Sequence, residues 1–271
     1  MGSNMPLLKT LSEYYDTAIK DRADPRTDGW FLVHSPWPPL CILLVYLVVC
    51  INAKRMMQNV PAFRLRGILL CYNTALVFLS AYMFYEFLVA SYLAEYNLFC
   101  QPVDYSTSPL AIRMAKVCWW YFISKYIELL DTVFFILRKK FNQVSFLHVY
   151  HHSTMLINWW LGVKYVAGGQ SFFIGMLNSF VHIIMYTYYA LSCFGPTVQK
   201  YLWWKKYLTV LQLVQFGAIF VHCFHNLWTE CDFPDWLNGM VCGYMISLIL
   251  FFLNFYIQSY LKGKQSKEKR N

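Results

Sequence analysis

Long runs of apolar residues dominate this chain and constrain its fold more than any other feature. A helix that crosses a bilayer takes about 20 mostly apolar residues. The runs that approach or exceed this length cover about residues 38–53, 67–93, 112–137, 145–165, 170–193, 207–228 and 236–260. The first is short, and the third and fourth are interrupted by polar residues, but together they predict seven membrane-spanning helices.

The composition supports an integral membrane protein. Only 14% of the 271 residues are charged and 58% are hydrophobic, with a mean hydropathy of +0.37, whereas about a quarter of a soluble domain is charged. No internal repeat or flexible linker is visible, so we expect residues 1–271 to form one all-α polytopic membrane domain. The N-terminal 30 or so residues lack the basic start and apolar core of a signal peptide, so no cleavage is expected.

Basic residues concentrate in alternate connections between the apolar runs. The loops at 54–66, 138–144 and 194–206 carry lysine and arginine and no acid, and the tail at 262–271 is also basic. The connection at 229–235 is acidic instead. The positive-inside rule therefore predicts that the basic loops and the C-terminus are cytoplasmic. An odd number of spans then places the N-terminus on the lumenal side.

The net charge of +9 lies mostly on that basic face. Membrane topology alone explains many of these residues, but such a face also attracts a polyanion, for example a phosphorylated cofactor. No stretch resembles a nucleic acid-binding module, and nucleic acid is not an expected partner.

Two of the nine cysteines, Cys100 and Cys231, fall in loops assigned to the lumenal side. An oxidising lumen would permit a disulfide between them, and we keep this as a hypothesis. The remaining cysteines lie in or beside the apolar runs and are expected to be small core residues.

Ionisable residues interrupt the third run in the stretch "KYIELLDT" (residues 125–132). Lys125 and Glu128 are three residues apart, and Glu128 and Thr132 are four apart, so they share one helical face with Asp131 nearby. Ionisable residues inside spans are rare and usually functional. Two compatible interpretations remain: a buried ion pair that fixes helix packing, and one wall of a polar cavity.

The fourth run contains three histidines in "FLHVYHHSTM" (residues 146–155). Positions i, i+3 and i+4 of a helix point the same way, so His148, His151 and His152 form one cluster that faces the bundle. A single buried histidine is usually a packing residue, but three on one turn indicate a functional site.

The fifth and sixth runs add further polar side chains. Asn178 and His182 lie one helical turn apart in the fifth run, while His222 and His225 are expected to pack between helices or close a tunnel at the lumenal side. A polar stripe on one helical face of the sixth run comprises Lys205, Thr209, Gln212 and Gln215. These runs predict a polar chamber entered from the basic face, with apolar walls beyond it for a long hydrophobic chain.

Three classes of protein could place a histidine-lined chamber in a membrane. The motif HxxHH occurs in di-iron desaturases, where imidazoles ligate iron, but those enzymes need more histidine boxes than this chain supplies. A seven-span receptor or a transporter would show signature segments or repeats that are missing here. Histidine can also act as a base or a nucleophile and transfer an acyl group, with Asn178 or another histidine holding the oxyanion.

Four segments carry a resemblance to a known family. The segments "KYIELLDT" (125–132), "QVSFLHVYHH" (143–152), "NSFVHIIMYTYY" (178–189) and "TVLQLVQ" (209–215) resemble the KxxExxDT, QxxFLHxYHH, NxxxHxxMYxYY and TxxQxxQ boxes of the ELO-type fatty acid elongases. They occur in the family's order, and the resemblance covers essentially the whole chain.

The resemblance implies a 3-oxoacyl-CoA synthase of the endoplasmic reticulum, which condenses a long-chain acyl-CoA with malonyl-CoA. It implies a ring of six helices around a tunnel with a seventh helix outside. No bound cofactor or metal is expected, and other enzymes of the elongation cycle and further copies of the chain are the expected protein partners. The tail "KEKRN" (267–271) fits a di-lysine retrieval signal, and Gln143 with Tyr150 is similar to the subgroup acting on polyunsaturated and very-long-chain substrates.

The family's roles transfer to matching residues of this chain. His151 is expected to take the acyl group, His182 with Asn178 to complete the reacting centre, and His148 and His152 to orient groups or exchange protons. Whether the acyl group is held covalently or both substrates react directly is left open. Glu128 and Asp131 are assigned structural roles. The residues expected to bind CoA and substrate are Lys125, Arg138, Lys140, Gln143, Tyr188, Lys205, Thr209 and Gln212.

Overall fold

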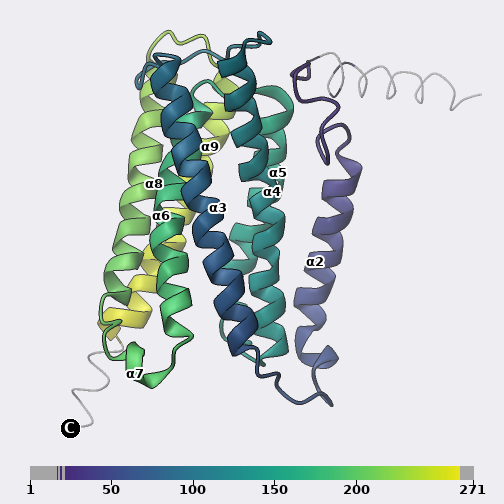
Figure 1. Ribbon diagram of the computed structural model, residues 1–271, viewed down its shortest axis with the longest axis vertical. Coiled ribbons are helices and arrows are strands. Elements are labelled where there is room, and N and C mark those ends of the chain that lie inside the picture. The colour runs from purple at the N-terminus through teal and green to yellow at the C-terminus, as the bar shows by residue number, and fades with distance from the viewer. Residues whose placement is uncertain (1–16, 18, 20–21, 263–271) are drawn as a thin grey trace, which may run out of the picture.

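The structure is a computed structural model that describes residues 17, 19 and 22–262, and these residues form helices and connections without any strand (Figure 1). The helices are α2 (Trp37–Met56), α3 (Arg66–Leu93), α4 (Pro109–Leu137), α5 (Phe146–Tyr165), α6 (Ser171–Ser192), α7 (Pro196–Gln199), α8 (Lys205–Trp228) and α9 (Asp235–Tyr256), and α9 continues as the π-helix η2 (Ile257–Lys262). The predicted all-helical fold is confirmed. The predicted di-lysine signal and most of the N-terminal segment lie outside the described residues.

Local sequence signals account for the helix starts around the polar segments. Ser108 caps α4 because its hydroxyl accepts a hydrogen bond from the backbone N–H of Ala111, and Pro109 follows at the first helical position. Ser145 caps α5 in the same way, and its hydroxyl accepts from the N–H of His148. The cap therefore starts α5 directly before the three histidines and sets them in its first two turns.

Six long helices close a ring, as the resemblance implied. The packed neighbours follow the order α3, α4, α5, α9, α8 and α6, and α6 packs back against α3. Helix α2 lies outside this ring against α4 and α5, at one edge of the bundle in Figure 1. At Gly175 of α6 a Cβ atom would lie 2.5 Å from Cζ of Phe87 on α3, so the absent side chain is what permits this close approach.

Successive long helices run in opposite directions (Figure 1). The connections 57–65, 138–145 and 193–204 therefore lie at one end of the bundle, which we call the basic end. The connections 94–108, 166–170 and 229–234 lie at the other end, which we call the disulfide end.

Within the described residues, five helices are long and apolar enough to cross a membrane: α2, α3, α6, α8 and α9 with η2. Helix α2 spans 20 residues and is longer than the run predicted at 38–53. Helices α4 and α5 are also long, at 29 and 20 residues, but they carry the polar stretches that lower their hydropathy. The count of seven spans stays a prediction.

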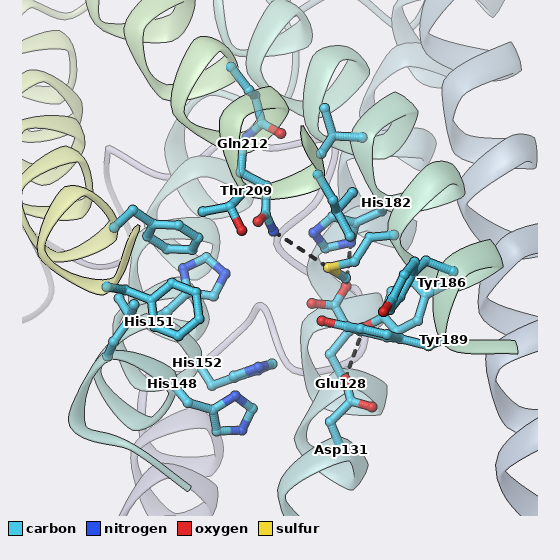
Figure 2. A pocket seen from close by; sticks show the side chains of 18 of the residues that line it. Glu128, Asp131, His148, His151, His152, His182, Tyr186, Tyr189, Thr209 and Gln212 are labelled. Atoms are coloured by element: carbon cyan, nitrogen blue, oxygen red, sulfur yellow. Dashed lines mark hydrogen bonds and ion pairs between the residues drawn. The ribbon is translucent and has the colours of Figure 1, made fainter. Parts of the chain in front are cut away.

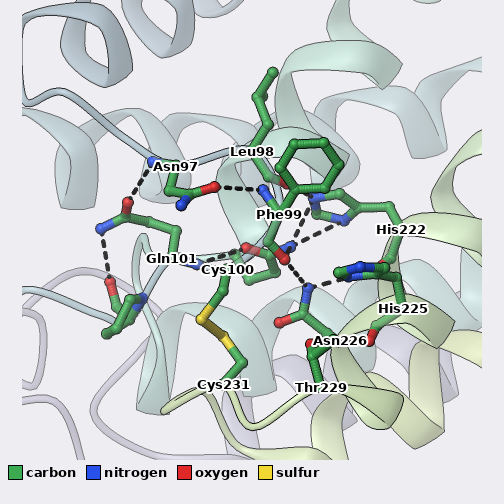
Figure 3. The surroundings of a disulfide bond; sticks show 12 residues. Asn97, Leu98, Phe99, Cys100, Gln101, His222, His225, Asn226, Thr229 and Cys231 are labelled. Atoms are coloured by element: carbon green, nitrogen blue, oxygen red, sulfur yellow. Dashed lines mark hydrogen bonds between the residues drawn. A yellow bond between two sulfur atoms is a disulfide. The ribbon is translucent and has the colours of Figure 1, made fainter.

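A disulfide joins two connections at the disulfide end (Figure 3). Cys100 and Cys231, 131 residues apart in sequence, are bonded as hypothesised. Beside them the carbonyl of Phe99 accepts hydrogen bonds from the side-chain amides of Asn226 (2.8 Å) and Gln170 (3.4 Å). The connection between α3 and α4 is thereby joined to the residue before α6, to α8 and to the connection between α8 and α9.

The segment before α2 is also anchored at this end, by buried charges. Arg26 pairs with Asp24, and its Nη2 donates to the carbonyl of Ala167 at 2.8 Å. The buried Nζ of Lys164 donates to Asp28, and this hydrogen bond holds the pKa of the Asp28 carboxyl below its ordinary value. The described part of the segment before α2 therefore docks on the end of α5 through one ion pair and a hydrogen bond from Arg26, which its polar sequence did not predict.

Replacing Cys100 with serine is expected to lower the free energy of unfolding by about 2 to 5 kcal/mol, because the disulfide closes a long loop in the unfolded chain. Thermal unfolding of the purified protein in detergent measures this. Cys71→Ser, at an exposed free cysteine of α3, is the matched control and should change little. Identical gel mobility of thiol-blocked wild-type protein with and without reductant would contradict the bond itself.

Candidate active site

Helices α4, α5, α6, α8 and α9, together with η2, line one cavity of about 230 Å³ (Figure 2). It opens toward the basic end, where Ser145, Lys205 and Tyr260 form part of its wall. Its carboxylate, imidazole, amine and amide side chains are Glu128, Asp131, His148, His151, His152, Asn178, His182, Lys205, Gln212 and Gln215. The ring thus brings all five predicted catalytic residues to one cavity.

The three histidines of α5 lie on one face and have different partners. The rings of His148 and His152 are 4.3 Å apart between centroids, and those of His151 and His152 are 5.5 Å apart. Nε2 of His148 lies 2.7 Å from the hydroxyl of Thr132 on α4, which is 3.0 Å from the hydroxyl of Tyr46 on α2. The outer helix is therefore linked to the cluster by two hydrogen bonds.

His151 is held by α9. Its Nδ1 lies 3.0 Å from the hydroxyl of Tyr244, which in turn lies 3.0 Å from the hydroxyl of Thr154. The sequence reasoning missed Tyr244, because a single tyrosine in the apolar run of α9 gives no signal. Thr154 could have been found, since it lies three residues after His151 on the same helical face.

The carboxylate of Glu128 is the centre of a second group on α4 and α6. Its Oε1 accepts from Nζ of Lys125 at 2.7 Å and from the Ser124 hydroxyl at 3.3 Å, and it lies 3.5 Å from Nδ1 of His182. The side chains of Lys125 and Glu128 are only 2% and 3% exposed. A buried charge needs partners of this kind, because its desolvation is costly.

Asn178 is oriented by α4. Its Oδ1 accepts hydrogen bonds from the hydroxyl of Tyr121 and from Nζ of Lys125, the latter at 3.5 Å. With its oxygen held by these donors, its amide nitrogen is the atom that can donate into the cavity. Tyr121, which the sequence reasoning did not single out, lies one helical turn before Lys125 and shares its face.

Asp131 lies toward the basic end of the same wall. Its Oδ2 accepts a hydrogen bond of 3.0 Å from the hydroxyl of Tyr186 on α6. The ring of Tyr186 packs edge-on against that of His182 at 5.6 Å. Asp131 thus connects α4 to α6 one turn away from Glu128.

The predicted substrate-binding residues other than Lys125 divide into two groups. Tyr188, Lys205, Thr209 and Gln212 line the cavity. The second group does not: Arg138, Lys140 and Gln143 lie in the connection between α4 and α5 at the basic end. Lys125 is buried beside Glu128 with its Nζ 4.1 Å from the centre of the Tyr121 ring, so the structure places it behind the cavity wall rather than at the mouth.

A second cavity of about 60 Å³ lies deeper in the ring and is mostly apolar. Four residues line both cavities: His151, Asn178, Gln215 and Phe216. The second cavity continues toward the disulfide end, where Gly162, Ser171 and Leu237 line it. The buried Oε1 of Gln215 has no hydrogen-bond partner in the described chain. His151 therefore stands where a polar space meets an apolar one.

Among the described residues, no three histidine, cysteine, aspartate or glutamate side chains are grouped as they would be to hold a metal ion. The site histidines contact hydroxyl groups, a carboxylate and one another instead. His222 lies outside the site, at the disulfide end, where its Nε2 is 2.7 Å from the amide nitrogen of Gln170 and 3.0 Å from the carbonyl of Leu98.

Fold and site together define a polytopic, all-helical membrane protein with an internal histidine-lined cavity. Residues 31–268 match the ELO family, described as the GNS1/SUR4 family, and the chain belongs to this family. It is 51% identical over 245 residues to "Very long chain fatty acid elongase 4" of Homo sapiens, an alignment that covers 90% of this chain and 78% of that protein.

Two further relatives carry similar names. The chain is 49% identical over 245 residues to "Very long chain fatty acid elongase 2" of Mus musculus, covering 90% of this chain and 83% of the relative. It is 45% identical over 264 residues to "Very long chain fatty acid elongase 7" of Drosophila melanogaster, covering 96% and 80%. The likeness to these relatives thus extends over most of the chain.

Replacing Lys125 with methionine is expected to lower the free energy of unfolding by about 3 to 5 kcal/mol, because it leaves the carboxylate of Glu128 buried without its strongest partner. The double variant Lys125→Met/Glu128→Gln removes both charges and should recover part of the loss. Thermal unfolding in detergent compares the two. Equal stability of the wild type and the single variant would show that the ion pair does not hold the site.

Proposed function

We propose that this protein is a fatty acid elongase that condenses a long-chain or polyunsaturated acyl-CoA with malonyl-CoA. The products are a 3-oxoacyl-CoA two carbons longer, CO2 and CoA. The observation that carries the proposal is the position of His151, which lines both the polar cavity and the apolar one. An acyl-CoA would match these two cavities, because its CoA portion is polar and its hydrocarbon chain is apolar. The thioester that joins the two portions would then lie beside His151.

In the covalent route, His151 is the nucleophile. Nε2 attacks the thioester carbonyl, and the C–S bond breaks. The thiolate of CoA takes the proton that the acylated imidazole gives up from Nδ1, which leaves a neutral acyl-imidazole. Malonyl-CoA then loses CO2, and the electron pair of the broken C–C bond forms an enolate. The enolate carbon attacks the acyl-imidazole and the C–N bond breaks. The imidazolate that leaves takes up the one proton that the overall condensation consumes, which restores the neutral imidazole.

The neighbouring side chains fit the charges that this sequence creates. The amide nitrogen of Asn178 can donate to the oxygen of the tetrahedral intermediate, since its own oxygen is held by Tyr121 and Lys125. His182, beside Glu128, completes the reacting centre from the opposite helix. His148 and His152 orient groups or exchange protons, and the enclosing ring limits hydrolysis of the intermediate.

The basic end suits the CoA portion of the substrates. Lys205, Thr209, Gln212 and Tyr188 line the cavity there, and we propose that they contact the phosphates and pantetheine. Arg138, Lys140 and Gln143 lie in a connection at the same end and are proposed to extend this surface. Lys125 is proposed to support Glu128 and Asn178 rather than to touch CoA.

We also propose a multi-pass location in the endoplasmic reticulum membrane with a lumenal N-terminus and a cytoplasmic C-terminus. The separation of the basic connections from the disulfide supports this orientation, because disulfides form in an oxidising lumen and basic loops favour the cytoplasm. Acyl-CoA and malonyl-CoA would then enter from the cytoplasm, the compartment that the basic end faces. Other enzymes of the elongation cycle are proposed partners.

Replacing His151 with alanine should abolish condensation, because His151 is the only imidazole among the four residues that line both cavities. The measurement is the incorporation of labelled malonyl-CoA by microsomes, across saturated and polyunsaturated acyl-CoAs. His225→Ala is the control: His225 packs against Phe99 at the disulfide end and should leave condensation intact. Near-normal activity of His151→Ala in correctly inserted protein would overturn the assignment.

Incubation with acyl-CoA alone should add the mass of one acyl group to the wild-type protein and none to His151→Ala. Only the covalent route leaves such an adduct, so intact mass spectrometry separates it from direct reaction of the two bound substrates. Condensation without any adduct at short reaction times would favour the direct route.

A further inference from the structure

Helix α2 lies outside the ring, yet one of its side chains is connected to the active site. Three residues of α2 are buried, Pro39, Tyr46 and Ala53, and their spacing of seven places them on one face of the helix. The hydroxyl of Tyr46 is the only polar group among these three side chains. Because Tyr46 is 6% exposed, its hydroxyl needs a hydrogen-bond partner inside the protein.

The partner of Tyr46 is Thr132 on α4. The two hydroxyl oxygens are 3.0 Å apart, and the oxygen of Thr132 lies 2.7 Å from Nε2 of His148 on α5. Thr132 is 1% exposed and does not line the cavity, whereas His148 does. The hydrogen bonds therefore run from the outer helix, by way of a residue behind the cavity wall, to a side chain of the active site.

This path does not depend on which ring nitrogen of His148 carries the proton, because each hydroxyl can donate once and accept twice. If Nε2 accepts, Thr132 donates to it and Tyr46 donates to Thr132. If Nε2 is protonated, Thr132 accepts from it and can donate to the oxygen of Tyr46. The three groups remain connected in both arrangements.

Thr132 is also the residue that holds the ring of His148. Within the described residues, its hydroxyl is the only group that makes a hydrogen bond with this ring. The rings of Phe135 and His152 lie beside it, with centroids 5.3 and 4.3 Å away. Without the contact at Nε2 the imidazole can turn about its Cβ–Cγ bond, since the preference for that torsion is broad.

We propose that Tyr46 is a positioning residue of the active site, which acts through Thr132 to hold the ring of His148. With Nε2 held by Thr132, Nδ1 is the nitrogen left to exchange a proton during condensation. Helix α2 then contributes to catalysis, although none of its residues lines either cavity. This proposal rests on the proposed function, in which His148 orients groups or exchanges protons.

Steady-state condensation kinetics with labelled malonyl-CoA test this role. Tyr46→Phe removes only the hydroxyl and should lower kcat by about 10-fold, because a less well held His148 is out of alignment for part of the time. The KM for acyl-CoA should stay within about 2-fold, since Tyr46 does not touch the substrate. Thr132→Val should lower kcat at least as much, and Thr132→Ser, which keeps the hydroxyl, should recover most of the loss. An unchanged kcat in Tyr46→Phe would overturn the proposal.

The double variant Tyr46→Phe/Thr132→Val distinguishes a relay from two separate packing effects. In a relay its kcat should equal that of Thr132→Val, because loss of the Thr132 hydroxyl already disconnects Tyr46 from His148. Losses that multiply would contradict the relay. Tyr105→Phe is the control with unchanged kcat: the Tyr105 hydroxyl also joins distant segments, donating to the carbonyl of Tyr165 at 3.0 Å, but Tyr105 lines neither cavity.

The environment of His148 is measured without turnover, by nitrogen NMR of the full chain labelled with 15N-histidine in detergent, at about pH 8 where imidazole is neutral. The His148 signals are identified by their loss in His148→Ala. We expect Tyr46→Phe to shift them, because the hydrogen bond at Nε2 is weakened, and Tyr105→Phe to leave them in place.

His148 signals that do not move in Tyr46→Phe would overturn the proposal. Wild-type protein that fails to condense the substrates, while Tyr46→Phe still shifts the His148 signals, would confirm the hydrogen-bond path and refute the proposed function, so the two failures are distinguishable.

Discussion

The rest of the site depends on the contacts of the buried Glu128 carboxylate. Lys125 supplies its counter-charge from the same helix, and His182 contacts it from α6. One carboxylate therefore joins α4 to α6, which form two walls of the cavity. The same lysine also contacts Asn178. Because a charge at this depth is tolerable only with its partners in place, α4 and α6 are held in the one arrangement that satisfies it.

The ring divides its interior by chemistry. Polar side chains occupy the half near the basic end, and the deeper half is apolar and aromatic. His151 lies at the boundary, fixed from α9 through Tyr244. A substrate with a charged head and a long hydrocarbon chain has only one orientation that matches such a tunnel. In the proposed function, that match places the thioester of an acyl-CoA beside His151.

Several contacts join the connections at the disulfide end. The Cys100–Cys231 disulfide and the hydrogen bonds to Phe99 join the connections there. The segment just before α2 is fixed to the end of α5 by the ion pair of Asp28 with Lys164 and by the hydrogen bond from Arg26 to the carbonyl of Ala167. The disulfide end is thus joined by covalent and polar contacts, whereas the polar cavity lies toward the basic end.

Sequence alone determined the helices, the face on which their polar residues lie and the basic end, because helical periodicity, apolar run length and loop charge are local properties. It also brought His148, His151 and His152 together, since one helical turn suffices. Tertiary structure alone decided that His151 meets Tyr244, 93 residues away, and that Lys125 lies behind the cavity wall. A periodic pattern shows which face of a helix turns inward, but the partner it meets depends on the order and rotation of the helices in the ring.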